Sequence, residues 1–377
     1  MIQKPRLKAL IIVLGIALLL LGIALILQWV SLGNPDLAES YATKVLPILT
    51  GTGIILWSWI PTSITEILVV LGTVTLLILF VIWLVRLIRY QEWRGLRSLR
   101  LLIIVGTCFS FLATNYILLY AINFQRPPLA QSLELDVKAR SQEELAAVTN
   151  WLAAEAAILR QDLPEDENGV FTFGEGGYKE VLRNAYLAYE NSSAAYPVIG
   201  YGLRVTPKPV NLSSYWSYTG ITGMYMPLLA EANVNIDQPD HSIPFSALHE
   251  IAHVKGIAPE DEANFIAFLT GLEHPDPAFR YSVLLTTWIY ASNELGNREH
   301  DKACLRLEPS PGMRRDLNAN ALYWSQHRGW LQEVSSTIND SMLKANRQED
   351  GVKSYGRMID LVLAWYAKEQ PARGDSE

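Results

Sequence analysis

Long uninterrupted apolar runs dominate the first third of the chain, whereas apolar and polar residues are interspersed in the rest. Three runs reach the roughly 20 apolar residues that a helix needs to cross a bilayer; they cover residues 9–30, 67–87 and 101–122. The first run is longer than the apolar core of a signal peptide, and no A-x-A cleavage site closely follows it. The pattern therefore predicts an uncleaved α-helical membrane anchor with three transmembrane helices within residues 1–128.

A fourth apolar stretch, residues 45–60, is interrupted by one proline and two glycines and is followed directly by Pro61. These residues disfavour a continuous spanning helix. Trp57 and Trp59 near its end are typical of the headgroup level of a bilayer. We therefore expect a re-entrant or interfacial segment.

From residue 129 onward the apolar positions recur mainly with helical spacing. One region before the centre looks extended, at residues 200–209 and 223–236, because Gly, Pro and β-branched residues punctuate it. Ser141 and Glu144 have the spacing of a capping box at the start of a helix. The predicted helices cover residues 141–160, 179–191, 245–255, 260–272, 278–295, 311–345 with interruptions, and 351–368. The pattern predicts a mostly helical α+β domain over residues 129–377.

Composition agrees with this division of the 377 residues. Half of the residues are hydrophobic and 18% are charged, which is too apolar for an ordinary soluble protein and too charged for a polytopic transporter. Residues 1–128 carry a net charge of +6 and residues 129–377 a net charge of −13, which together give the −7 of the whole chain. The acidic domain argues against binding to nucleic acid, and the apolar content argues against disorder.

The distribution of positive charge predicts the orientation in the membrane. Three basic residues precede the first span, and the link between the second and third spans is rich in arginine. The members of this link are Arg86, Arg89, Arg94, Arg97 and Arg100, with the single acid Glu92. Because cytoplasmic loops carry an excess of Lys and Arg, we expect a cytoplasmic N-terminus and link. Three spans then place residues 129–377 on the outer face, where the bilayer surface is a neighbour.

Cysteine is too scarce to staple the domain or to build a thiolate metal site. Cys108 lies in the third apolar run, and Cys304 lies in the acidic domain. No disulfide can therefore form within the domain, and any metal must be held by histidine and carboxylate side chains.

One stretch carries the pattern of a catalytic metal site. His249 and His253 are four residues apart in a predicted helix, so that their imidazoles project from one face. That spacing can bind one Zn²⁺, and Glu250 can act as general base toward a water bound to the metal. With six histidines in the chain, H-E-x-x-H arises by chance in well under about 1 in 100 such sequences. The alternative is a pair of hydrogen-bonded core histidines.

The third metal ligand is sought in the acidic start of the next predicted helix. The metzincin pattern is absent, because Pro259 occupies the position of its third histidine. Glu262 shares a helical face with apolar residues, where a carboxylate needs a partner such as a metal. Glu260 fits better as a partner of the helix dipole on the solvent side. We therefore expect Glu262 as ligand, with Glu260 as second choice; the alternative is that these acids only begin a helix.

Three further residues are weaker candidates. The segment 223–236 precedes the predicted site helix, where an edge strand in H-E-x-x-H enzymes lines the cleft and pairs with an extended substrate. Asn233 and Asn235 alternate with apolar residues there and can bind substrate, or can be ordinary polar surface. Tyr281 follows the Glu262 helix and can offer a hydroxyl to an oxyanion.

Several segments together resemble the bacterial membrane-protein family known as domain of unknown function 3810. They are residues 123–129, 207–210, 220–223, 231–235, 244–265 and 354–358. The resemblance implies a zincin-like protein of the bacterial plasma membrane, without a known substrate. The H-E-x-x-H motif and the following E-A-N at residues 262–264 are also similar to the site of the ImmA/IrrE-type metallopeptidases. That similarity implies Glu262 as the third zinc ligand, although Val254 and Lys255 replace a common Gln-Arg pair.

The sequence thus predicts a membrane-anchored zinc metallopeptidase of the gluzincin type. His249, His253 and Glu262 would hold Zn²⁺, and Glu250 would activate water against a peptide or protein substrate at the outer membrane face. A zinc-stabilised envelope sensor or scaffold without activity is the alternative, although such a site has no need of Glu250. Hydrolysis of a non-peptide amide remains open, and a His₂Glu set also accepts Mn²⁺, Co²⁺ or Fe²⁺.

Overall fold

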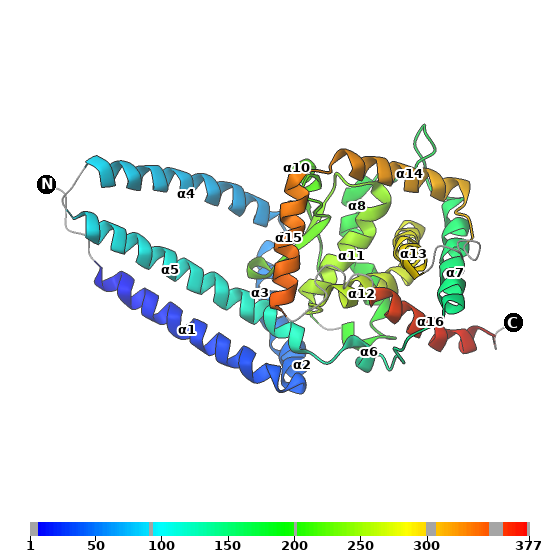
Figure 1. Ribbon diagram of the computed structural model, residues 1–377, viewed down its shortest axis with the longest axis horizontal. Coiled ribbons are helices and arrows are strands. Elements are labelled where there is room, and N and C mark those ends of the chain that lie inside the picture. Colours follow the sequence, from blue (N-terminus) through cyan, green and yellow to red (C-terminus); the bar gives the residue numbers. More distant parts are fainter. Residues whose placement is uncertain (1–6, 90–92, 200–201, 299–306, 347–356, 375–377) are drawn as a thin grey trace.

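Three long apolar helices extend from one end of a mostly helical domain in the computed structural model (Figure 1), which describes residues 7–89, 93–199, 202–298, 307–346 and 357–374. They are α1 (Lys8–Leu32), α4 (Ile64–Arg89) and α5 (Arg94–Leu119), and each has the length and composition needed to cross a membrane. These helices confirm the spans predicted at 9–30 and 67–87. The third helix, α5, begins earlier than the predicted 101–122. It also ends earlier, because a 3₁₀ turn, η1 (Ala121–Gln125), follows it.

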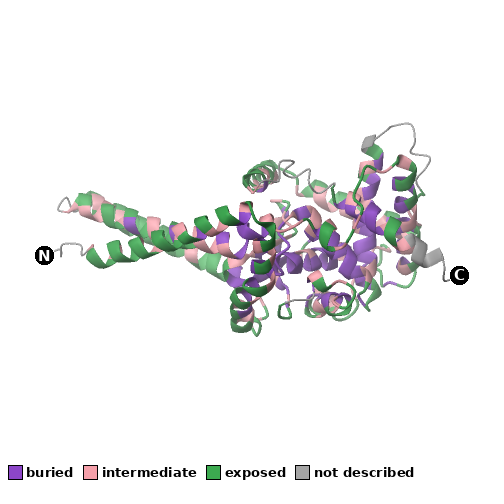
Figure 2. Ribbon diagram, turned by 90° about the horizontal axis from the view of Figure 1, so that it is seen from below, coloured by how far each residue is buried: buried purple, intermediate pink, exposed green. Residues whose placement is uncertain are grey.

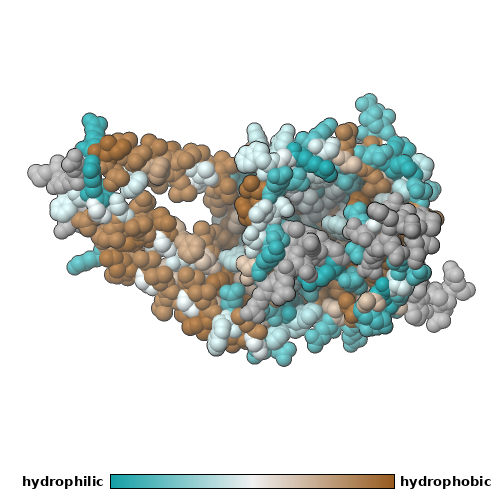
Figure 3. All heavy atoms as spheres, in the orientation of Figure 1, coloured by the Kyte–Doolittle hydropathy of each residue, from teal (hydrophilic) through white to brown (hydrophobic). Residues whose placement is uncertain are grey.

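Helices α1 and α5 pack against each other, whereas α4 stands apart from them. The contact of α1 and α5 continues into a small apolar cluster that includes Ala24, Ile117 and Leu119. Along α4 the large apolar side chains are exposed on all sides. Figure 3 shows an opening between α4 and the α1–α5 pair, lined by hydrophobic residues. The exposed apolar surface of this region is the surface that lipid would cover.

Two short helices connect α1 to α4 beside the domain. They are α2 (Pro35–Lys44) and α3 (Leu46–Trp57). With 12 residues, α3 is too short to span a bilayer, in agreement with the predicted interruption of residues 45–60. Its depth in the membrane stays a prediction.

The core of the domain surrounds one buried helix, α11 (Ile243–Val254). Helices α12 (Glu260–Leu272) and α13 (Pro277–Arg298) pack on it, α7 (Gln142–Arg160) packs on α13, and α16 (Met358–Gly374) packs on α12. Figure 2 shows that buried residues gather here, whereas the long helices are largely exposed. The remaining helices are α6 (Leu129–Ser132), α8 (Gly177–Asn184), α9 (Tyr186–Ser192), α10 (Ser213–Ser217), α14 (Pro311–Gln326) and α15 (Trp330–Ala345).

A three-stranded mixed sheet lies beside α11. The strands are β1 (Lys208–Val210), β2 (Gly223–Met226) and β3 (Glu231–Asn235), in the order β1-β3-β2. β1 runs parallel to β3, and β2 runs antiparallel to it. The single extended segment expected at 223–236 is thus two strands, because a 3₁₀ turn beginning at Pro227 reverses the chain between them. Within the described part of the segment 200–209, only residues from Lys208 onward form a strand.

The other predicted elements agree closely with the structure. The capping box of α7 is present, with Ser141 accepting from the Glu144 amide and Glu144 accepting from the Ser141 amide. The predicted helix at 179–191 is divided into α8 and α9, and the one at 311–345 into α14 and α15. Residues 200–201, residues 351–356 of the last predicted helix, and Cys304 lie outside the described residues.

Buried polar side chains join the sheet to the membrane segment. The Glu231 carboxylate accepts hydrogen bonds from the amides of Ile64 (3.1 Å) and Thr65 (2.8 Å), the first residues of α4. The Lys208 ammonium donates to the carbonyls of Trp57 (3.2 Å) and Ser58 (3.3 Å), where α3 ends. These bonds satisfy helix-end groups that otherwise lack partners. The packing therefore continues across residue 128, where the sequence predicted a domain boundary.

Candidate metal centre

His249 and His253 of α11 face each other near the end of that helix. Their Nε2 atoms are 3.0 Å apart, as expected for positions i and i+4 on one face. α11 ends at Val254, and Gly256 then adopts φ +80°, a conformation that favours glycine. A Cβ on Gly256 would also lie 2.7 Å from Leu46 of α3. The end of the site helix therefore abuts the membrane segment.

Glu260, the first residue of α12, completes a cluster of three possible ligands. Its carboxylate lies 3.2 Å from Nε2 of His249 and 3.6 Å from Nε2 of His253. One ligand atom from each of the three residues lies within 4.8 Å of the others. All three side chains are largely buried, with exposed fractions of 12% for His249, 4% for His253 and 10% for Glu260.

His253 and Glu260 shift each other's pKa. Burial by itself lowers the pKa of the His253 imidazole, but the Glu260 and Glu250 carboxylates and the Ile257 carbonyl together outweigh burial and raise that pKa to about 9. Burial by itself raises the pKa of Glu260, but the two imidazoles hold it well below its usual range. The site thus brings a carboxylate and two imidazoles together at one point.

The orientation of His253 is fixed by its surroundings. Its Nδ1 atom lies 2.7 Å from the carbonyl of Ile257, which leaves Nε2 turned toward the cluster. The ring of Tyr120 packs edge-on against it at 5.8 Å between centroids, and the ring of Tyr225 stacks on it at 6.4 Å. Tyr120 directly follows α5, so the cluster lies at the end of a spanning helix.

Glu250 lies between α11 and the edge strand β2. A Cβ on Gly223 would be 2.5 Å from Oε1 of Glu250, so only a glycine allows this approach. The backbone amide of Tyr225 hydrogen bonds the carboxylate, while the buried Oε2 atom has no hydrogen-bond partner in the part of the chain that the structure describes. Burial raises the pKa of Glu250 to about 7. Glu250 directly follows His249 in the chain, and its side chain is buried.

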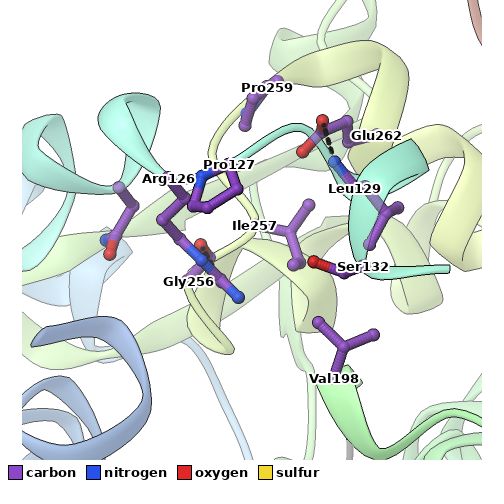
Figure 4. Close-up of a pocket in the computed structure, with 10 residues that line it drawn as sticks. Arg126, Pro127, Leu129, Ser132, Val198, Gly256, Ile257, Pro259 and Glu262 are labelled. Atoms are coloured by element: carbon purple, nitrogen blue, oxygen red, sulfur yellow. Dashed lines mark hydrogen bonds between the residues drawn. The ribbon is translucent and has the colours of Figure 1, made fainter. Parts of the chain in front are cut away.

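Glu262, the expected third ligand, lies elsewhere. Its Oε1 atom accepts a hydrogen bond of 2.7 Å from the amide of Leu129, and burial raises its pKa to about 7. Figure 4 shows this carboxylate at a small cavity with Arg126, Gly256 and Pro259. The structure therefore brings Glu260, the second choice, to the two histidines, and gives Glu262 a backbone donor as partner.

The reason for this difference is the packing of α12. From Ala263 to Gly271 the helix is buried on every side, so that an apolar face does not identify the side toward α11. The side carrying Glu260 continues with the small residues Ala267 and Gly271. A Cβ on Gly271 would lie 2.3 Å from Val283 of α13 and 3.1 Å from Leu248 of α11, so this part of α12 packs closely on both helices.

The asparagine candidates do not line the cluster. Both lie on β3, the central strand, and both are fully buried. The Asn233 side chain accepts from Ser63 (2.6 Å), and the Asn235 amide donates to the Ile221 carbonyl (2.9 Å). The edge strand expected within 223–236 is β2, whose outer edge has no strand partner among the described residues.

Tyr281 is also remote from the cluster. It is fully buried, and its hydroxyl hydrogen bonds the carboxylate of Asp316. Asp316 in turn accepts from the guanidinium of Arg160 at 2.7 Å. The sequence analysis did not single out Tyr290 of α13, whose pKa is raised to about 12 by burial and by the charge of Glu260. Its ring packs against Phe245 of α11 at 6.5 Å.

Fold and site together define a class of protein. It has three helices able to cross a membrane, a mostly helical domain with a small mixed sheet, and a candidate His₂Glu metal centre at the membrane end of that domain. Residues 41–363 match the family described as protein of unknown function DUF3810, and the chain belongs to that family. No curated protein and no solved structure matches the chain.

Proposed function

We propose that this chain is a membrane-anchored metal-dependent hydrolase, a metallopeptidase of the zincin type. The observation that carries the proposal is the convergence of His249, His253 and Glu260, with Glu250 beside them on α11. This arrangement pairs three ligands with an additional buried carboxylate. A purely structural metal site has no need of the fourth group.

The donor set fits one zinc ion. Tetrahedral zinc with ligand bonds near 2.0–2.1 Å places neighbouring ligand atoms about 3.3 Å apart. Here the two Nε2 atoms are 3.0 Å apart, and Glu260 approaches His249 through Oε2 at 3.2 Å and His253 through Oε1 at 3.6 Å. One ligand atom from each residue lies within 4.8 Å of the others. Within the described residues the cluster offers three protein ligands, which is the number found in catalytic zinc sites with one open position. Other divalent ions that accept nitrogen and oxygen ligands remain alternatives.

A bound divalent cation would supply Lewis-acid polarisation and a lowered pKa for water. The protein supplies the rest. Glu250 is placed to take the proton of an attacking water and to return it to the leaving amine. The Ile257 carbonyl fixes the His253 ring, and the rings of Tyr120 and Tyr225 shield it from solvent. Tyr290, whose pKa is raised by burial and by the Glu260 charge, is a candidate to stabilise negative charge on the reacting carbonyl.

The edge strand β2 supports a peptide as substrate. β2 is paired with β3 on one side only, and it carries the Gly223 and Tyr225 positions that contact Glu250. An extended peptide can add to such an edge through backbone hydrogen bonds, which would bring its carbonyl toward Glu250. The predicted orientation places this substrate at the outer face of the membrane.

Metal content and peptide hydrolysis of the full-length chain in detergent test the proposal. We expect about one zinc per chain in the wild type and in Glu250→Gln, and loss of zinc in His249→Ala. With a mixture of peptides analysed by mass spectrometry, wild type should cleave and Glu250→Gln should lose at least about 100-fold in rate. Zinc binding without cleavage in wild type and in Glu250→Gln would favour the zinc-stabilised sensor or scaffold. A wild type that cannot be loaded with metal would exclude the metal-dependent hydrolase and the zinc-stabilised scaffold alike.

A further inference from the structure

Helix α15 runs roughly perpendicular to the long helices, at the level where they meet the domain (Figures 1 and 2). At its C-terminal end the Asn346 amide donates to the Tyr116 hydroxyl of α5 at 2.6 Å. Before its N-terminal end the His327 ring packs on Tyr218 at 4.7 Å. Tyr218 directly follows α10 in the chain. Leu212, the residue before α10, is held at the start of α4, because its amide donates to the Glu66 carboxylate at 2.6 Å. Both ends of α15 are therefore tied to the same level, the level at which α4 begins and α5 ends.

The side of α15 that faces the protein is mostly polar. It consists of the partly buried Gln332, Ser335 and Asn339, and of the buried Leu343. These positions follow the three- and four-residue spacing of one helical face. In a helix that belongs only to a domain core, this face would carry the apolar residues.

The apolar residues of α15 form a separate stripe that is exposed. Its members, the α15 stripe, are Leu331 (41% exposed), Val334 (47%), Ile338 (65%) and Met342 (37%). Trp330 (70% exposed), seven residues before Thr337, lies where this stripe borders the charged side. At 3.6 residues per turn the centre of this stripe lies about a third of a turn from the protein-facing side. About a third of a turn in the opposite direction lie Glu333, Thr337 and Lys344, all exposed. The helix thus has one side toward the protein, one apolar side and one charged side.

Exposed aromatic residues occur at the same level of the molecule. Trp59, between α3 and α4, is 76% exposed, and Tyr215 of α10 is 69% exposed. Trp59 lies five residues before α4, and Tyr215 lies three residues after Leu212, which hydrogen bonds Glu66 of α4. Aromatic side chains are typical of the boundary between headgroups and acyl chains. This placement favours lipid as the partner of the α15 stripe over a soluble protein.

We propose that α15 is an interfacial helix whose apolar stripe is buried at the surface of the bilayer that contains α1, α4 and α5. The separation of apolar and charged sides is the arrangement of helices that lie in the interface plane. With 16 residues the helix is about 24 Å long, enough to brace the domain between α4 and α5. This inference does not depend on the proposed hydrolase activity.

The test uses the full-length chain, without Cys108 and Cys304, in vesicles of neutral phospholipid. An environment-sensitive fluorophore is attached through Ile338→Cys on the α15 stripe, or through the adjacent Thr337→Cys on the charged side as matched control. We expect emission at shorter wavelength at position 338, quenching there by nitroxide on the lipid acyl chains, and iodide quenching on the order of threefold weaker than at 337.

Equal iodide quenching at both positions would overturn the proposal, because the stripe would then face water. Protection of position 338 from both iodide and lipid nitroxide would also overturn it, since protein rather than lipid would cover the stripe. If that protection disappeared on dilution of the protein in lipid, the covering partner would be a second copy of the chain.

Discussion

At the scale of single residues, two carboxylates separated by one position have different environments. Glu260 faces two imidazoles, and Glu262 accepts a hydrogen bond from the Leu129 amide. Both carry a shifted pKa, downward for Glu260 because the imidazoles outweigh burial, and upward to about 7 for Glu262 because of burial. A pKa shift alone therefore does not identify a metal ligand. What distinguishes the two residues is the group that each carboxylate contacts, which is a pair of imidazoles for Glu260 and a backbone amide for Glu262.

Glu260→Gln and its neighbour Glu262→Gln form a matched pair that tests the third ligand. Glu260→Gln should weaken zinc binding by at least about 100-fold, because an amide replaces a charged ligand. Glu262→Gln should keep about one zinc per chain, since its carboxylate points to a backbone amide. Zinc titration with a competing chelator measures both. Retention of tight binding in Glu260→Gln together with its loss in Glu262→Gln would restore the assignment made from sequence.

The sequence predicts part of this site well, because local spacing determines it. The i, i+4 positions of His249 and His253 bring their rings together in any helix, and Glu250 follows from the same motif. The position of Glu260 depends instead on how α12 lies against α11, and a helix buried all round has no apolar face that reveals its orientation. Asn233 and Asn235 were misplaced for a related reason, since their strand is central in the sheet rather than at its edge.

Asp316 is the residue whose loss should most destabilise the domain away from the site. It is fully buried, and it accepts from Arg160, Tyr281 and the Phe171 amide. Asp316→Ala removes the buried carboxylate partner of Arg160 and leaves the guanidinium with the more exposed Glu165 carboxylate (3.3 Å) and the Gly169 carbonyl, so we expect a loss of about 3 kcal/mol in the free energy of unfolding. Tyr281→Phe removes one hydroxyl and should cost about 1–3 kcal/mol. Chemical denaturation in detergent measures both, and unchanged zinc content in Tyr281→Phe would separate this residue from the candidate site.

At the scale of elements, helices are predicted more accurately than strands. The predicted range 260–272 coincides with α12, and the spans lie where uninterrupted apolar runs placed them. The strands have three to five residues, too few for an alternating pattern to define their limits. β3 in addition carries the polar residues Glu231, Asn233 and Asn235, because its partners include helix ends of the membrane segment rather than apolar side chains alone.

Glu231→Gln tests the connection between β3 and α4. The buried carboxylate accepts from two amides at the start of α4 and from the Thr65 hydroxyl, and Lys208 is its nearby positive partner. Neutralising it removes charge-assisted bonds and leaves the Lys208 charge without that partner, so we expect a loss of about 3 kcal/mol in unfolding free energy. The control Glu66→Gln alters the more exposed bonds to residues 211 and 212 and should cost about 1 kcal/mol. Equal losses of unfolding free energy in the two variants would mean that the buried bonds of Glu231 contribute no more than the more exposed bonds of Glu66.

At the scale of the whole molecule, the loop from α1 to α4 and the domain occupy the same end of the long helices. Glu39 of α2 accepts from Arg126 at 2.7 Å, and Arg126 donates to the Gly256 carbonyl at 2.8 Å, beside the candidate site. This arrangement is the one that three spans require, because each crossing exchanges sides. The membrane segment is therefore part of the support of the site, and residues 129–377 alone would lack the partners of Glu231 and Lys208.

The orientation of this assembly follows from its charge and can be measured. The basic link near Arg94 and Arg97 lies at the end of the long helices opposite the domain (Figure 1), and the positive-inside rule predicts that it remains in the cytoplasm. In intact cells producing the chain without Cys108 and Cys304, an impermeant maleimide should label Glu165→Cys in the domain, where the glutamate side chain is 46% exposed. Arg94→Cys should be labelled only after permeabilisation. The reverse pattern would place the domain and its candidate site in the cytoplasm, and the substrate would then be sought there.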